Sequence, residues 1–419
     1  MLDLARLLSR LRGFGLAALL AAPVACSSTP DAATGSDDIV ELPHTDVKNQ
    51  AIGNCWLYAT ASWTEALHAA ATEEKLDLSE SYWSYWHWYL QVLWSADPSP
   101  DNAFGNLEQV NTGGGFAMAA HILKYMGAMK EGDFIPEDEG ARTSRRQSSA
   151  QAAINKSLRE GALKDRAARA DMDLLRKEMD AAWGLSPEVS ARLDAAFGRN
   201  LEKSPDAAST EETKVIPSSK LLVAVRDPAT KEKVNVPLAD ILPSAIEGIP
   251  GGRFAWQEVA YPTTPTERRA FMKRMQRALH DGMPPLLTFL VDFAALRGSK
   301  FADVPASPGR QGGHMVAVSD YQAENVPGFG TLLAGKLESR PEALDAALAD
   351  EVQIPFIRVK NSWGPTGGGD ELSVSGHYDL YMKYLDGPAS FCLDANGETN
   401  RDNCRPETPF TSLVLPAGY

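Results

Sequence analysis

The order of the segments along the chain constrains its fold more than any other feature. Residues 55–70 and 79–94 repeat apolar side chains at helical spacing, and a third helix is expected at 116–125, after a run of glycines. The second half consists mainly of short β-type segments. Because helices and strands occur in blocks and do not alternate, the pattern predicts an α+β fold and argues against a doubly wound parallel sheet. The expected strands lie at 221–225, 233–236, 286–291, 312–318, 354–360 and 378–384, and one further helix is expected from Thr266 to just before Gly282.

Changes in composition suggest how the 419 residues are divided. We expect an export signal at 1–26, a flexible tether at 27–40, a helical lobe at 41–140, a helical insertion at 141–214, and a β-rich lobe with a C-terminal loop at 215–419. The net charge is −14, and no basic run is visible. Because phosphate binding needs a basic face, nucleic acid is not an expected partner.

The first 26 residues have the composition of an export signal. Arg6, Arg10 and Arg12 precede an apolar run at 13–25 that is shorter than the ~20 residues of a membrane span. The run ends in Pro-Val-Ala-Cys, which resembles the bacterial lipobox and makes Cys26 a candidate for lipidation. A plain cleaved signal peptide is the alternative. We therefore expect a protein exported from the bacterial cytoplasm, either anchored as a lipoprotein or periplasmic or secreted.

The cysteines single out one thiol. Cys392 and Cys404 are 12 residues apart in a polar, turn-rich segment, which suits a local disulfide in an exported protein. With Cys26 assigned to lipid, Cys55 has no partner. An unpaired thiol in an oxidising compartment is a liability unless it has a function, so Cys55 is a candidate functional residue.

The surroundings of Cys55 suit a nucleophile. It follows Gly53 and Asn54 at the predicted start of a long helix, where the helix dipole favours an anion. A nucleophilic thiolate needs a pKa below the ordinary ~8.5, which a helix N-terminus or a neighbouring imidazolium provides. The Cys55 backbone N–H and the Gln50 amide are candidate donors to a developing oxyanion. A base would have to come from another element.

Several motifs occur in a fixed order along the chain. Together they resemble the papain-like cysteine peptidases, and the large helical insertion is similar to that of the bleomycin-hydrolase-like branch. The motifs are Gln50 with Gly53-Asn54-Cys55-Trp56, Leu78-Ser79-Glu80, the glycine loop Asn111 to Gly115, the helix–Pro–strand segment Ala278 to Leu286, Gly313-His314-Met315-Val316-Ala317-Val318, and Val359-Lys360-Asn361-Ser362-Trp363-Gly364.

The resemblance implies a fold, a reaction and a set of roles. It implies a helical left lobe and a β-barrel-like right lobe with a cleft between them, a peptide or protein substrate, and no metal or other cofactor. Cys55 would attack the substrate carbonyl, His314 would act as its base, and Asn361 would orient the imidazole. Gln50 would complete the oxyanion hole. The substrate-binding positions that it implies are Gly113, Gly114, Gly313 and Trp363.

Some features depart from the family pattern or leave alternatives open. Gln50 lies five residues before Cys55, one fewer than usual, so Asn49 is an alternative donor. His377 is a fallback for the base, since it also follows a glycine into a β pattern. A catalytically silent binding protein and an acyl or peptidyl transferase are alternative functions. We expect the inserted segment 141–250 to cover or narrow the cleft, while the substrate and the oligomeric state stay open.

Overall fold

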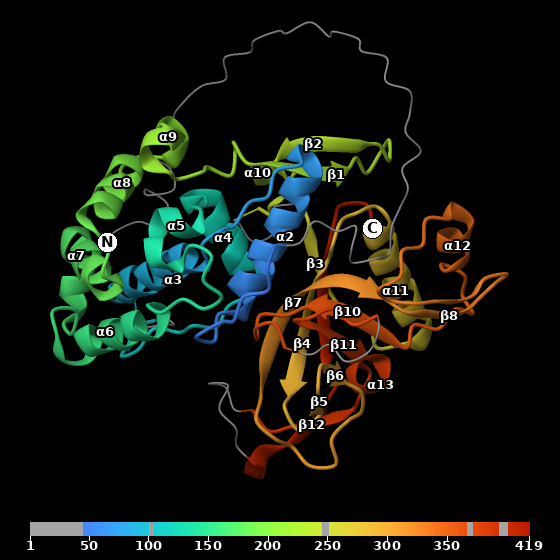
Figure 1. Ribbon diagram of the computed structural model, residues 1–419. Coiled ribbons are helices and arrows are strands. Elements are labelled where there is room, and N and C mark those ends of the chain that lie inside the picture. Colours follow the sequence, from blue (N-terminus) through green and yellow to red (C-terminus); the bar gives the residue numbers. More distant parts are fainter. Residues whose placement is uncertain (1–44, 100–101, 103, 245–250, 367–371, 394–400) are drawn as a thin grey trace, which may run out of the picture.

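The computed structural model describes residues 45–99, 102, 104–244, 251–366, 372–393 and 401–419. It places a group of helices beside a large sheet, with the long helix α2 between them (Figure 1). The predicted α+β fold is confirmed. The helices are α2 (Cys55–Thr72), α3 (Glu80–Ser95), α4 (Phe116–Met126), α5 (Glu131–Phe134), α6 (Gln147–Glu160), α7 (Met172–Trp183), α8 (Pro187–Phe197), α9 (Thr210–Thr213), α10 (Leu238–Ile241), α11 (Pro265–His280), α12 (Pro341–Ala346) and α13 (Met382–Leu385).

Most strands belong to one sheet of eight, in the order β3-β14-β4-β7-β10-β11-β6-β5. Neighbouring strands are antiparallel except β11 and β6. Three two-stranded sheets, β1-β2, β8-β9 and β12-β13, complete the β structure. The strands are β1 (Leu222–Arg226), β2 (Lys233–Pro237), β3 (Gln257–Ala260), β4 (Leu286–Asp292), β5 (Leu296–Arg297), β6 (Lys300–Phe301), β7 (Gln311–Tyr321), β8 (Ala323–Val326), β9 (Gly330–Leu332), β10 (Phe356–Lys360), β11 (His377–Tyr381), β12 (Ala389–Phe391), β13 (Arg405–Glu407) and β14 (Phe410–Leu415).

Helix α3 explains the aromatic segment that follows Ser79. The Ser79 side chain accepts a hydrogen bond from the Tyr82 N–H and so caps the helix. Trp83, Trp86 and Trp88 are all fully buried, because neighbouring helices cover the helix on several sides. The aromatic density therefore forms core and does not offer an open platform for a ligand.

Strand β7 takes part in two hydrophobic cores because its side chains alternate between the faces of the sheet. Met315 and Ala317 belong to the core of the helical half. Val316 and Val318 belong to the core of the sheet half, and His314 shares their face by parity. The one strand that carries His314 thus joins the two halves of the molecule.

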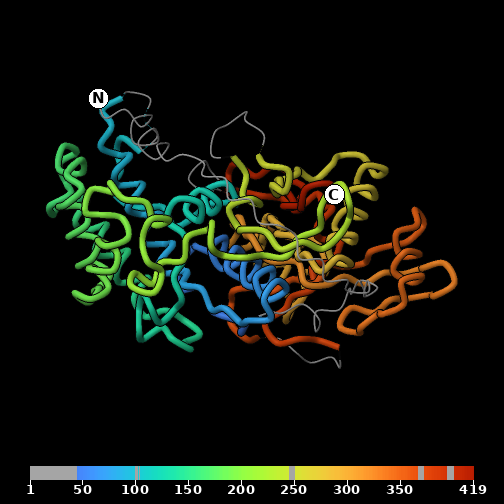
Figure 2. The backbone as a smooth tube through the Cα atoms, turned by 90° about the horizontal axis from the view of Figure 1, so that it is seen from above, coloured from blue at the N-terminus to red at the C-terminus, as the bar shows by residue number. Residues whose placement is uncertain are grey.

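The segment predicted as an insertion packs closely on the helical half. Figures 1 and 2 place α6, α7 and α8 beside α3, on the side away from the sheet. Leu158, Trp183 and Phe197 lie in the same hydrophobic core as the aromatic side chains of α3. These helices therefore extend the helical half and are continuous with its interior.

Several predicted boundaries change in the structure. The strand expected at 378–384 ends at Tyr381, and Met382–Leu385 form the short helix α13. The predicted disulfide between Cys392 and Cys404 is present. Cys26 and the whole predicted export signal lie outside the described residues. None of the helices that the structure describes combines the length and apolar character needed to cross a bilayer.

Candidate active site

Cys55 is the first residue of α2 and lies at the contact between the helical half and the sheet. Its side chain is buried, and it is the one free cysteine among the described residues. Backbone hydrogen bonds from Met315, Trp56 and Cys55 itself reach its sulfur. Two of these come from the start of α2, so the sulfur occupies the helix N-terminus, as the sequence predicts.

Burial nevertheless determines the protonation of this thiol. Removal from water raises the pKa of Cys55 above its ordinary value, because the charged thiolate loses its hydration. The backbone hydrogen bonds from Met315 and Trp56 act in the opposite direction and are smaller. The lowered pKa that a nucleophilic thiolate needs is thus not found in this unliganded structure.

The position of the proton on His314 follows from its contact with Asn361. The Asn361 Oδ1 lies 2.7 Å from the His314 Nε2 and accepts a hydrogen bond from the Ser362 backbone N–H at 2.7 Å. Because a backbone N–H can only donate, the atom of Asn361 that faces it is an acceptor oxygen. Nε2 must therefore carry the hydrogen. The other ring nitrogen, Nδ1, then has a free lone pair and can act as a base.

Trp363 holds the plane of this imidazole. The two rings are stacked with centroids 4.5 Å apart, and the Phe289 ring lies edge-on to the imidazole with centroids 5.7 Å apart. Burial lowers the pKa of His314 to about 4, although the hydrogen bond from its ring to Asn361 acts the other way. The ring is therefore neutral near pH 7, and its burial makes it a weaker base than an ordinary imidazole.

The structure brings Cys55 and His314 onto adjoining elements. Met315, whose backbone bonds to the sulfur, directly follows His314 in β7. No hydrogen bond joins the thiol to the imidazole in this part of the described chain. Proton transfer between them would require the thiol and the imidazole to approach to hydrogen-bond distance.

Gln50 is fastened to the segment that carries Asn361. Its backbone N–H donates to the Ser362 carbonyl at 2.8 Å, and its side-chain oxygen accepts from the Ser362 hydroxyl at 2.6 Å. The Gln50 Nε2 donates to the Ile52 carbonyl at 2.8 Å, which leaves its second hydrogen for another acceptor. Asn49, the alternative donor, is exposed and pairs with Trp363 in an isolated β-bridge.

The glycine loop before α4 offers open backbone groups. A Cβ on Gly114 would lie 2.5 Å from the Trp56 ring, so only glycine fits there. The Asn111 side chain accepts from the Gly113 N–H at 2.9 Å, and the Gln91 amide holds the Asn111 backbone through both its N–H and its C=O. Among the described residues, the Gly114 N–H and C=O have no partner. Gly313 is also exposed, with open space where its Cβ would be.

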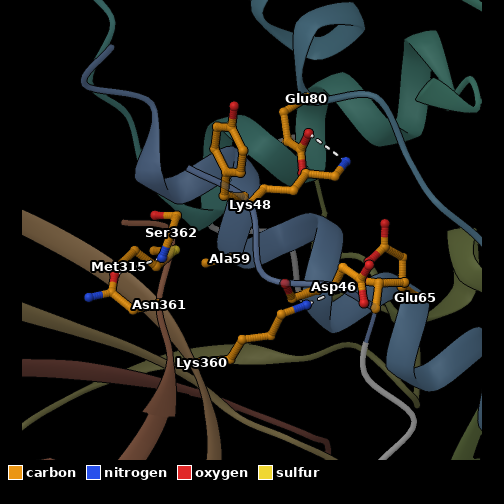
Figure 3. Close-up of a pocket in the computed structure, with 12 residues that line it drawn as sticks. Asp46, Lys48, Ala59, Glu65, Glu80, Met315, Lys360, Asn361 and Ser362 are labelled. Carbon is orange, nitrogen blue, oxygen red and sulfur yellow. Dashed lines mark hydrogen bonds and ion pairs between the residues drawn. The ribbon is translucent and has the colours of Figure 1, made fainter. Parts of the chain in front are cut away.

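A largely buried charge cluster lies beside the segment of Asn361 and Ser362, and the sequence motifs do not indicate its extent (Figure 3). The Lys48 ammonium contacts Asp77 at 2.8 Å, Glu80 at 3.0 Å, and Glu131. Burial would lower the pKa of Lys48, but the charges of Glu80 and Glu131 outweigh it and raise that pKa. One lysine cannot neutralise several carboxylates. The pKa values of Glu80 and Glu131 are accordingly raised, first by burial and then by neighbouring carboxylates.

This cluster bridges the two halves through the backbone of Lys48. Lys48 lies two residues before Gln50, and its carbonyl accepts from the Gly364 N–H at 3.1 Å. Its ammonium is bound to the helical half. Lys360 approaches from β10 and donates to Thr45 at 3.0 Å, and Thr45 donates to Glu65 at 2.5 Å. Both sides of the site are thus tied to the irregular segment before Cys55, residues 45–54.

The first residues of the predicted insertion also support this segment. The Gln147 side chain is fully buried and donates to Tyr58 at 3.2 Å and to Ser81 at 3.1 Å. Its oxygen accepts from the Asn54 amide at 3.3 Å, directly before Cys55. The Asn49 N–H donates to the Arg142 carbonyl at 2.6 Å. Sequence patterns missed Gln147, because its partners lie far away in the chain.

The fallback base, His377, lies elsewhere. It begins β11 and pairs with Lys360 of β10, so β10 separates it from β7. Burial, and then the charge of Lys360, lower the pKa of His377 to about 3. In the described part of the chain, no group of three or more His, Cys, Asp or Glu side chains is placed to hold a metal ion.

Comparison with known proteins gives weak similarities. No family model and no curated protein matches the chain. Among solved structures, it is similar to PepW from Lactobacillus rhamnosis at 14% identity, over 92% of this chain and 82% of that one, with a TM-score of 0.42. It is also similar to xylellain, a cysteine protease from Xylella fastidiosa, at 12% identity, over 93% and 90% of the two chains, with a TM-score of 0.33.

Similarities of this size do not establish an activity. The chain itself has an α+β arrangement that agrees with the fold class predicted from the sequence. A helix that begins with Cys55 packs on a sheet that carries His314, and the segment after β10 carries Asn361. The assignment of roles to these residues is treated below.

Proposed function

We propose that this chain is a cysteine-type peptidase that hydrolyses peptide bonds through a thioester formed on Cys55. The observation that carries the proposal is the double hydrogen bond at the Asn361 Oδ1, which fixes the His314 proton on Nε2. This tautomer leaves Nδ1 free to accept a proton. The thiol of Cys55, bonded to the Met315 backbone next to that ring, is the proton donor that the proposal assigns.

In the proposed reaction, His314 takes the thiol proton while the Cys55 sulfur attacks the substrate carbonyl carbon. The carbonyl oxygen becomes negative and would be held by the Cys55 backbone N–H and the second Gln50 Nε2 hydrogen. His314 then returns the proton to the leaving amine, and the C–N bond breaks to give a thioester. His314 then takes a proton from water, whose oxygen attacks the thioester carbonyl carbon. The C–S bond breaks to release the acid, and His314 returns the proton to the sulfur.

The test is cleavage of a peptide library by the wild-type protein and by Cys55→Ala, with products identified by mass spectrometry. Wild type should produce defined fragments, and Cys55→Ala should lose nearly all turnover while keeping its circular dichroism spectrum and melting temperature. Gly53 and Trp56 stay unchanged, so the variant differs only at the sulfur. Cleavage that persists in Cys55→Ala would remove the nucleophile assignment.

One observation favours a second function, a catalytically silent binding protein. The Cys55 pKa is raised, the His314 pKa is lowered, and no hydrogen bond joins the two groups in the unliganded structure. A silent protein would bind peptides without cleaving them. Alkylation of wild type with a peptidyl epoxide separates the two functions, since a competent dyad should react at Cys55 and a silent site should not.

The same thioester could pass its acyl group to an amine instead of water. Product analysis with a competing amine, such as a glycine amide, distinguishes this transferase from a hydrolase.

We further propose that the protein acts outside the cytoplasm, through the export signal and the candidate lipidation site at Cys26. Labelling with a radioactive fatty acid in a bacterial host, in wild type and in Cys26→Ala, tests the anchor.

A further inference from the structure

A line of stacked side chains leads from the imidazole to the surface of the sheet half. Trp363 stacks on His314 with centroids 4.5 Å apart, and Phe293 lies 5.1 Å from the Trp363 ring. The guanidinium carbon of Arg310 lies 4.2 Å from the Phe293 centroid. Together these separations place the Arg310 charge no more than about 14 Å from the imidazole.

The line ends at Arg310, which is exposed and whose guanidinium has no carboxylate partner among the described residues. Phe293 and Trp363 are partly exposed, so the rings leave surface for a bound chain. A planar guanidinium held face-on by an aromatic ring keeps its N–H edge free for a carboxylate.

The backbone on either side of Arg310 is rigid. The buried Asp292 carboxylate accepts from the Gly309 N–H at 3.0 Å and from the Gln311 amide at 2.7 Å. A Cβ on Gly309 would lie 2.8 Å from Ala294, so the turn is closely packed. The Arg310 carbonyl accepts from the Phe293 N–H at 2.9 Å. Such anchoring fixes the point from which the Arg310 side chain extends, and the Phe293 ring is the contact that restrains its guanidinium, which lowers the entropic cost of binding.

The chemistry of the proposed reaction determines which part of a substrate meets Arg310. His314 must protonate the leaving amine, so the residues after the scissile bond depart on its side of the site. The glycine loop with Gly114 lies on the helical half, beside Trp56. An extended chain spans roughly 3.3–3.6 Å per residue. A distance of about 14 Å therefore covers at most about four residues of the leaving part.

We propose that Arg310 is a specificity-determining residue that binds a substrate carboxylate within the first few residues after the scissile bond. The carboxylate is either the substrate C-terminus or an acidic side chain. The proposal rests on the proposed peptidase function and adds the substrate class: peptides with a negative charge close to the cleaved bond on the leaving side.

The experiment uses fluorogenic peptides that share one acyl part and differ after the scissile bond. One ends two residues later in a free carboxylate, one is its amide, and one is amidated with Glu as the second leaving residue. For an exposed ion pair we expect kcat/KM to be roughly fivefold higher with either carboxylate than with the neutral amide. A preference for the free terminus alone would identify the substrate C-terminus, and a preference for Glu alone would identify the side chain.

The variants test whether Arg310 causes the preference. Arg310→Gln should cleave all three peptides at the rate of the neutral one, and Arg310→Lys should restore part of the preference. Arg297→Gln is the matched control, since Arg297 is also exposed but its guanidinium is bonded to the Ala294 and Leu296 carbonyls. It should keep the full preference.

The kinetic results distinguish a failure of the Arg310 proposal from a failure of the proposed peptidase function. Cys55-dependent cleavage at equal rates on all three peptides, or an unchanged preference in Arg310→Gln, overturns the role of Arg310 alone. Absence of Cys55-dependent cleavage on every peptide overturns the peptidase function, and the role of Arg310 with it.

Discussion

The Ser362 hydroxyl donates to the Gln50 side-chain oxygen at 2.6 Å, although 312 residues separate the two along the chain. This bond fixes which end of the Gln50 amide carries the N–H groups. Asn361, which would orient the base, directly precedes Ser362, which would orient Gln50 as the oxyanion donor. Two functions of the proposed site thus depend on one short segment.

The first prediction concerns this bond. Gln50→Ala should lower kcat by about 10²-fold with little change in KM, because an oxyanion donor acts mainly in the transition state. Ser362→Ala should have a smaller effect, since Gln50 remains but is less well oriented. The double variant should equal Gln50→Ala, because the serine acts only through the glutamine. Steady-state kinetics on the best peptide measure this, and additive losses would contradict it.

The second prediction concerns the pH dependence of the thiol. The Cys55 pKa is raised by burial, and the His314 pKa is lowered to about 4 by burial, so thiol and imidazole are both neutral near pH 7. Alkylation of the unliganded protein by iodoacetamide should therefore be slow at pH 6. It should rise with pH, with a midpoint above the ordinary thiol value of ~8.5. A plateau already reached below pH 6 would instead show a thiolate–imidazolium pair. Cys55→Ala provides the blank.

The third prediction concerns Glu131 and stability. Its folded pKa is raised to about 9 by burial and the Glu80 charge, from an ordinary 4.5. The folded state thus holds an extra proton between these values, and the free energy of unfolding falls as pH rises through them. Between pH 7.5 and 9 the proton on Glu131 should make the free energy of unfolding fall by up to about 1.4 kcal/mol per pH unit. Glu131→Gln should remove this contribution.

Urea unfolding at three pH values measures this slope. The matched control is Glu188→Gln, since the Glu188 side chain is 75% exposed on α8. It should leave the slope of the wild type unchanged. An equal slope in Glu131→Gln and wild type would show that Glu131 is already ionised at neutral pH.

The fourth prediction concerns Gln147. Gln147→Leu leaves the buried Asn54 amide and the Ser81 hydroxyl without this partner and should lower the free energy of unfolding by about 1–3 kcal/mol. It should also lower kcat, because Asn54 directly precedes Cys55. Ser148→Ala is the control, since its exposed hydroxyl contacts the Ala51 carbonyl at 3.4 Å. A Gln147→Leu protein with unchanged kcat would show that Gln147 supports stability only.

The sequence indicated those parts of the site that are local. Gly53 and Asn54 before a helical pattern located Cys55 at a helix start, and a glycine-led apolar run located His314 on a strand. The Asn361 segment was found through its motif. Each of these depends on neighbouring residues, whose spacing a sequence displays directly.

The supporting contacts depend on long-range packing, which spacing does not display. The Lys48–Glu131 contact spans 83 residues and the Gln147–Asn54 contact spans 93. Glu80 lies within a recognised motif and Lys48 lies two residues before Gln50, but nothing in the motifs indicates that Glu131 would join them. The apolar run of β7 predicts a strand, but which of its faces packs against which core depends on the fold.

The alternation in β7 also has a consequence for misfolding. If β7 slipped by one residue against β4 and β10, Met315 and Ala317 would move into the sheet core, and the His314 ring would turn toward α2, away from Asn361. Both interiors would be mispacked at the same time as the imidazole lost its partner. A chain with the wrong strand pairing would thus lose stability and the His314–Asn361 pair at the same time.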